Sequence, residues 1–136
     1  MLFRSAAAGN AIVAIEENRI AVADGEAALK LNREAQPRCR FAPGRVEMKI
    51  GTVREADVVV LDPPREGCAP SVLREVFRRL RPASAVYVSC NPEALASDLR
   101  RIAEAGYRIT NVQPVDMFPH TAHIETVVRL ARKNMT

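Results

Sequence analysis

The sequence predicts an α/β protein built around a mostly parallel sheet. Apolar segments of strand length alternate with segments whose apolar residues recur at helical spacing, which is the pattern of strand–helix–strand units. Residues 57–62 and 84–89 are short and almost continuously apolar, which is typical of parallel strands buried on both faces. The chain has 136 residues, 48% of them hydrophobic, so it can form one core of ordinary domain size.

The expected elements follow from apolar periodicity and from turn residues. Six segments are expected to be strands: 11–16, 38–41, 57–62, 84–89, 107–115 and 124–130. Three are expected to be helices: 19–32, 71–80 and 92–105. Ser71 is the expected N-cap of the second helix, and residues 44–54 leave helix and strand open. Only the loop 116–123 separates the last two strands, so we expect them to pair antiparallel.

Composition narrows the class of protein. The net charge is +4, and arginines cluster within 74–81 and 100–108. Such a surface suits phosphate-bearing partners, although a solvated helix face has the same composition. No apolar run could span a membrane, and residues 1–5 lack the apolar stretch of a signal peptide, so we expect a cytoplasmic protein. The three cysteines and two histidines lack the spacing of disulfide frameworks or zinc sites, so no metal is expected.

Four side chains with chemical potential fall at one edge of the expected sheet. Glu16, Asp62 and Cys90 each end a strand, and Glu125 lies at the start of the last one. Ligands of open α/β sheets bind beyond the carboxyl ends of the strands. An antiparallel last strand would begin at that same edge. We therefore expect these four residues to converge on one rim.

Cys90 lies in the segment Ser89-Cys90-Asn91-Pro92, where an expected strand turns into an expected helix. Free backbone N–H groups and the positive end of a helix stabilise a thiolate at such a position. The alternative is a buried structural cysteine, which is the commoner fate of this residue. Position alone leaves both interpretations open.

The two acids also have ordinary alternatives. Asp62 precedes Pro63-Pro64, which stiffen the loop and can hold a carboxylate toward a base or an amine, but an Asp can equally cap a turn. Glu16 ends the first expected strand of this chain, and an acid that ends the second strand of a nucleotide-binding unit commonly binds ribose hydroxyls. Its neighbour Glu17 could take that role, or both could be solvated.

Three motifs carry a family resemblance. Asp-Pro-Pro-Arg-Glu-Gly occupies 62–67, Tyr-Val-Ser-Cys-Asn-Pro occupies 87–92, and Asp-Met-Phe-Pro-His-Thr-Ala-His-Ile-Glu occupies 116–125. In this order they resemble the bacterial S-adenosylmethionine-dependent RNA uracil-C5-methyltransferases, over about residues 11–131. The third motif looks more like the ribosomal-RNA (23S) members than the transfer-RNA members.

The resemblance implies a fold, a reaction and residue roles. The fold would be a Rossmann-like class I methyltransferase sheet, and the partners would be RNA and S-adenosyl-L-methionine. Cys90 matches the family's nucleophile and Glu125 its general base. Asp62 matches the acid at the shared edge of cofactor and target base, and Glu16 the acid that binds the cofactor's ribose.

The chain also departs from the family's pattern. The Gly-rich loop after the first strand is absent, and residues 5–10 look like the end of the following helix. Arg45 stands where related enzymes often carry Asp or Asn for the adenine. We therefore expect 1–136 to be a partial methyltransferase catalytic domain that is truncated at the N-terminus and lacks the first strand and the Gly-rich loop.

Three alternatives remain at this point. One is a catalytically inactive truncated RNA-binding or interaction module, and another is a tRNA uridine-C5 methyltransferase. A cytosine-C5 methyltransferase also uses a thiol, but there the nucleophile usually follows a proline, whereas here Ser89 precedes Cys90. The sequence does not indicate an oligomeric state.

Overall fold

The computed structural model of the chain describes residues 2–117, 119–121 and 124–133. The chain divides into two compact units, Met1–Thr52 and Val53–Thr136. The expectation that 1–136 belongs to one catalytic domain stays a prediction. None of the helices in the described ranges is long and apolar enough to cross a membrane.

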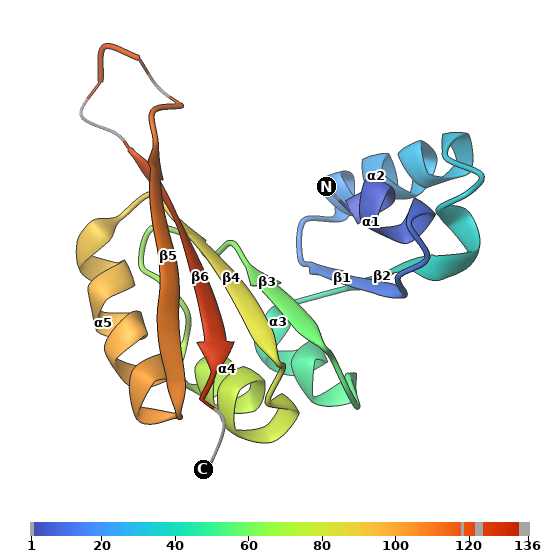
Figure 1. The fold of residues 1–136 in the computed structure, drawn as a ribbon. Coiled ribbons are helices and arrows are strands. Elements are labelled where there is room, and N and C mark those ends of the chain that lie inside the picture. The colour runs from blue at the N-terminus through green and yellow to red at the C-terminus, as the bar shows by residue number, and fades with distance from the viewer. Residues whose placement is uncertain (1, 118, 122–123, 134–136) are drawn as a thin grey trace. The chain divides into compact units, whose positions relative to one another are not determined.

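The first unit contains two parallel strands and the helices around them. Its elements are α1 (Leu2–Ala7), β1 (Ile12–Glu16), α2 (Arg19–Leu31), a 3₁₀ turn (Gln36–Arg38), β2 (Cys39–Pro43), α3 (Val46–Lys49) and a second 3₁₀ turn (Ile50–Thr52). β1 and β2 pair in parallel, with Glu16 opposite Pro43 (Figure 1). The segment that the sequence left open thus forms short helical turns.

Local interactions explain how α2 forms in the first unit. The Asn18 side chain accepts hydrogen bonds from the N–H groups of Ile20 and Ala21, at 2.9 and 3.3 Å, and so caps the helix. Gly25 faces the Phe41 ring so closely that an added Cβ would lie 2.4 Å from the ring's Cζ atom. The small core of the unit consists of Ala6, Leu29, Ala35 and Cys39, with Ile12 and Phe41 packed against it.

The second unit is a four-stranded sheet. Its elements are β3 (Val58–Leu61), α4 (Pro70–Arg74) continuing into the π-helical segment η3 (Glu75–Leu80), β4 (Ser84–Ser89), α5 (Pro92–Glu104), β5 (Tyr107–Val115) and β6 (Glu125–Arg132). The strand order is β3-β4-β6-β5. β3 and β4 are parallel, and β6 runs antiparallel to both its neighbours. The adjacent parallel pair and the antiparallel last strand that the sequence predicted are therefore confirmed (Figure 1).

Helices α4 and α5 pack on one face of this sheet. The Phe77 and Tyr107 rings meet edge to face, with centroids 4.8 Å apart, and the Tyr107 hydroxyl donates to the Pro82 carbonyl at 2.7 Å. The side chains at the centre are almost fully buried: Val72, Val76, Phe77, Tyr87, Ile102, Tyr107, Val128 and Leu130.

Two sequence expectations about this unit were wrong. β3 was expected to be buried on both faces, but Val58 and Val60 are 57% and 45% exposed. They point away from the sheet face of Leu61, which is the face that α4 and α5 cover. The helix expected to start after an N-cap at Ser71 instead begins at Pro70, with Ala69 in the cap position. Proline favours this first helical position because it needs no backbone N–H there.

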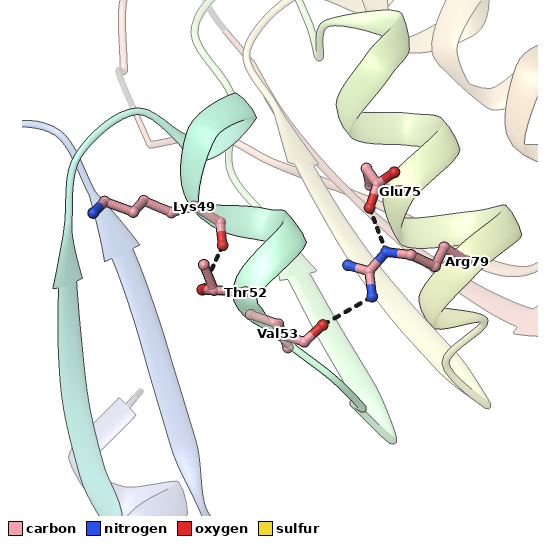
Figure 2. A network of polar contacts seen from close by, with 5 residues as sticks. All are labelled: Lys49, Thr52, Val53, Glu75 and Arg79. Atoms are coloured by element: carbon pink, nitrogen blue, oxygen red, sulfur yellow. Dashed lines mark hydrogen bonds and ion pairs between the residues drawn. The ribbon is translucent and has the colours of Figure 1, made fainter.

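Arg79 ties the start of the second unit to η3. Its Nη1 donates to the Val53 carbonyl oxygen at 2.9 Å, and its Nε contacts the Glu75 carboxylate one helical turn earlier (Figure 2). In the first unit, the Thr52 hydroxyl closes the final turn by donating to the Lys49 carbonyl at 2.7 Å (Figure 2).

Candidate active site

The strand register brings three of the expected site residues to one rim of the second unit. Asp62 follows β3 and Cys90 follows the parallel strand β4, so both lie at the carboxyl end of the pair. In the antiparallel pair β4–β6, Ser89 lies opposite Thr126. Glu125 directly precedes Thr126, so it begins β6 beside the end of β4. Asp62 is exposed, whereas Cys90 and Glu125 are partly buried.

The turn at Cys90 is held by its two neighbours. The Ser89 hydroxyl accepts from the Asn91 N–H at 3.1 Å and donates to the Asn91 carbonyl at 3.0 Å. The Asn91 side-chain oxygen in turn accepts from the N–H groups of Glu93 and Ala94, at 3.0 and 3.4 Å, and caps α5. Cys90 therefore lies in a fixed turn at the N-terminus of a 13-residue helix.

The loop after β3 is fastened to this same helix. Asn91 uses its side-chain Nδ2 to donate to the Arg65 carbonyl at 2.9 Å. Further along the loop, the Cys68 N–H donates to Oδ2 of Asp98, on the second turn of α5, at 2.8 Å. The loop that starts at Asp62 and the turn that carries Cys90 thus share a support.

The other two cysteines have different surroundings. Cys39 lies in the core of the first unit, and burial raises the pKa of its thiol. Cys68 lies close to Tyr87, whose pKa is raised by burial, then by the hydrogen bond to Asp98 and by the nearness of Cys68.

Sequence reasoning missed Asp98. It is only 4% exposed, and its Oδ2 also accepts from the Tyr87 hydroxyl at 2.5 Å. Its spacing carried a signal, because Asp98 lies three residues after Leu95 and four before Ile102, on the apolar stripe of α5. An acid in such a stripe needs buried hydrogen-bond donors, and Tyr87 and Cys68 provide them.

Glu16 ends β1 in the first unit, so it is not among the residues that the second unit brings together. Its Oε1 accepts from the Asn18 N–H at 2.8 Å, which fixes the carboxylate beside the start of α2. The neighbouring Glu17 lies 4.0 Å from Arg45 at the surface, and Arg45 also pairs with Glu47 at 3.5 Å.

Both ends of the second unit's sheet carry charged side chains. Five acids lie on the rim of Cys90 and in its loops: Asp62, Glu66, Glu93, Asp116 and Glu125. At the other end, Arg132 donates to the Arg81 carbonyl at 2.8 Å, Lys133 follows β6, and Arg108 pairs with Ala131. These four basic side chains are exposed. In the part of the chain that the structure describes, no group of three or more His, Cys, Asp and Glu is arranged to hold a metal ion.

Solved structures define the class of fold. The chain superposes on the precorrin-6y C5,15-methyltransferase of Geobacter metallireducens with a TM-score of 0.68 and 14% identity, covering 90% of this chain and 68% of that one. For a putative RNA methyltransferase of Pyrococcus horikoshii the TM-score is 0.64 with 14% identity, over 91% and 62% of the two chains. The fold is that of the class I methyltransferases.

The sequence places the chain within this class. Residues 7–133 match the family model described as tRNA (Uracil-5-)-methyltransferase, and the chain belongs to that family. An uncharacterized RNA methyltransferase of Synechocystis is 46% identical over 124 residues, which are 90% of this chain and 26% of the relative. One from Gloeobacter violaceus is 43% identical over 127 residues, 93% of this chain and 27% of the relative. The chain therefore spans about a quarter of the length of these relatives.

Proposed function

We propose that this chain carries the catalytic residues of an RNA uracil-C5-methyltransferase, with Cys90 as the covalent nucleophile. The observation that carries the proposal is the juxtaposition of a thiol and two carboxylates at one rim. Cys90 lies in the capped turn before α5, Asp62 ends the neighbouring strand, and Glu125 begins the strand on the other side. The match to the family model supports the assignment of uracil-C5 methylation to this arrangement.

The reaction begins with Cys90 because uracil C5 is a poor nucleophile. When the Cys90 thiolate forms an S–C6 bond, the electrons of the C5–C6 double bond move toward the O4 carbonyl, and C5 becomes nucleophilic. The Cys90 thiol lies beside the N-terminus of helix α5, in the turn that Asn91 caps. Cys39 is buried in the first unit, and Cys68 lies in the loop after β3 with its backbone N–H bound to Asp98, so neither is as well placed for this step.

Glu125 completes the cycle. After C5 has gained the methyl group, it still carries its hydrogen, and the Glu125 carboxylate takes this proton as a general base. The electrons of the C5–H bond re-form the C5–C6 double bond. The S–C6 bond breaks in the same step, its electrons leave with the sulfur, and Cys90 departs as a thiolate, ready for another turnover.

The proposed methyl donor is S-adenosylmethionine, the cofactor that the family resemblance implies. When bound, it supplies the methyl group from its sulfonium centre. One oxygen of the Glu16 carboxylate is held by the Asn18 N–H, and its other oxygen can accept from a ribose hydroxyl. Asp62 presents an exposed carboxylate at the rim of Cys90 and can hold a donor group there.

We further propose that the substrate is ribosomal RNA, following the third motif. A base stacked in a helix cannot reach a thiol on a sheet rim, so the target uridine must be turned out of its stack. The competing candidate is an RNA-binding module without activity. The four basic residues at the far end of the sheet could contact RNA phosphates in the methyltransferase or in the inactive module.

A methylation assay separates these candidates. A completed enzyme, in which this chain replaces the matching segment of the Synechocystis relative, is incubated with radiolabelled S-adenosylmethionine and with either ribosomal or transfer RNA. We expect label in 5-methyluridine of ribosomal RNA. Label in transfer RNA alone would correct the substrate, and label in 5-methylcytidine would contradict the proposed reaction. RNA binding without any label would favour the inactive module.

The exposed basic residues at the far end of the sheet lead to a separate prediction about RNA affinity. The six residues of β4 span about 20 Å at about 3.3 Å per residue, so RNA that reaches both ends must be extended or folded over the unit. The logarithm of the RNA association constant falls linearly with the logarithm of the salt concentration. Replacing Arg81, Arg108 and Lys133 by Gln should make this slope less steep by about 3, because each lost phosphate contact reduces its magnitude by about 1.

The measurement is titration of a fluorescent hairpin RNA with this chain at several salt concentrations. The matched control replaces three exposed basic residues of the first unit, Lys30, Arg33 and Arg38, by Gln, and should leave the slope unchanged. A slope lowered equally by both triple variants would mean that the chain binds RNA through its overall charge alone.

A further inference from the structure

The proposed reaction leaves one buried acid unused. Asp98 lies on the inner face of α5 with 4% of its surface exposed. A single oxygen, Oδ2, accepts from the Tyr87 hydroxyl at 2.5 Å and from the Cys68 N–H at 2.8 Å. The first donor comes from β4, three residues before Cys90, and the second comes from the loop that follows Asp62.

The backbone of the loop is shaped to reach this oxygen. Gly67 has a φ of +84°, a conformation that L side chains rarely adopt, and its N–H donates to the Pro64 carbonyl at 2.9 Å. A Cβ added to Gly67 would lie 2.7 Å from Oδ2 of Asp98. The loop therefore packs directly on the carboxylate, with no room for a side chain between them.

The loop is fixed at two points along one helix. Asn91, the cap of α5, donates to the Arg65 carbonyl, and Asp98, two turns into α5, accepts from the Cys68 N–H. Pro63 and Pro64 stiffen the connection from Asp62 to the first of these points. The Cys68 contact thus adds a second attachment of the loop to α5, the helix that also carries the turn of Cys90.

A buried carboxylate is a costly way to stabilise a fold. Burial of the charge costs several kcal/mol in general, and an apolar residue in the stripe of α5 would avoid that cost. What an apolar residue cannot do is accept from two donors that belong to two different segments. Charge-assisted hydrogen bonds of this kind also fix geometry more tightly than neutral ones.

We propose that Asp98 is a positioning residue, which holds the Asp62–Cys68 loop at a fixed place beside the Cys90 turn by joining β4, α5 and this loop at one oxygen. The proposal rests on the proposed function, because it gives this joint, the pair of hydrogen bonds to Oδ2 of Asp98, a role in the geometry of that reaction. Asp98 itself is enclosed beneath the loop and takes no part in bond making.

The first measurement is amide hydrogen exchange at residues 66–68 in this 136-residue chain. Asp98→Ala should speed exchange at the Cys68 amide by about tenfold or more, because the amide loses a charged acceptor. Asp98→Asn keeps an oxygen that can accept from both donors and should stay within about threefold of the unchanged chain. Glu104→Ala, an exposed change on the same helix, is the matched control and should have no effect.

The second measurement is the rate of adduct formation by the completed enzyme with RNA that carries 5-fluorouridine at the target. Asp98→Ala should slow the adduct by about ten- to a hundredfold, the range that a displacement of about 1 Å produces. RNA affinity should be unchanged, and Asp98→Asn should restore most of the rate. Gly67→Ala, which pushes the loop away from Asp98 without removing a core group, should slow the adduct as well and covers the case in which Asp98→Ala fails to fold.

The results separate this inference from the proposed function. If the unchanged completed enzyme forms no adduct, the proposed function fails, while exchange at Cys68 still shows whether Asp98 anchors the loop. Unchanged exchange in Asp98→Ala would overturn the anchor. Faster exchange in both Asp98→Ala and Gly67→Ala, with adduct formation at the original rate, would show that the joint does not serve the site and would overturn the proposal.

Discussion

Glu125→Gln in the completed enzyme should accumulate a covalent protein–RNA complex on RNA that carries ordinary uridine. The amide can no longer take the C5 proton, while Cys90 and the methyl donor are unaffected. Attack and methyl transfer should proceed, and elimination should stall. The unchanged enzyme should show almost none of this complex, because it completes each turnover.

The complex is measured by denaturing gel electrophoresis with labelled RNA and S-adenosylmethionine. Glu93→Gln is the matched control, because Glu93 is an exposed glutamate on the same rim, at the first turn of α5. The control should turn over normally and leave no complex. Accumulation in Glu93→Gln instead of Glu125→Gln would move the general base to α5.

Cys90→Ala should remove both the adduct and methyl transfer. Loss of a covalent nucleophile commonly costs at least about 10⁴-fold in rate, so no turnover should be detectable. Cys90 is partly buried at the end of a strand, and its turn is held by Ser89 and Asn91, so the variant should fold. Its circular dichroism and its RNA affinity should match those of the unchanged enzyme.

Cys68→Ala is the control for the loss of a thiol near the site. Its backbone N–H still reaches Asp98, so the loop should keep its place and methyl transfer should continue. If Cys68→Ala inactivated the enzyme and Cys90→Ala left it active, Cys68 would be the nucleophile in place of Cys90.

The sequence predicted the parts of the fold that depend on local pattern. The parallel neighbours β3 and β4 and the hairpin β5–β6 could be predicted from the sequence. Apolar runs, helical spacing and the absence of a helical pattern in the sequence of 116–123 each limit the possible pairing. The exposure of Val58 and Val60 could not be predicted. A continuous apolar run shows that a strand could be covered on both faces, but it does not show which elements cover it.

The candidate site could also be predicted only in part. Because parallel strands end at one edge, the sequence sufficed to bring Asp62 and Cys90 together, and the antiparallel β6 added Glu125. The supports of these residues were missed because one partner in each hydrogen bond is a backbone group. The bonds from Asn91 to the Arg65 carbonyl and from the Cys68 N–H to Asp98 join residues 26 and 30 positions apart, and no residue type marks such a bond.

The most direct test of the account is to locate the adduct by mass spectrometry. The completed enzyme is incubated with S-adenosylmethionine and with RNA carrying 5-fluorouridine, whose fluorine cannot leave as the proton does, so the adduct persists. Trypsin cleaves after Arg65 and Arg74 on either side of Cys68 and leaves Cys90 in a separate peptide. Covalent catalysis by Cys90 predicts that the Cys90 peptide carries the methylated nucleotide. A nucleotide on the Cys68 peptide, or no adduct from an enzyme that methylates ordinary uridine, would contradict it.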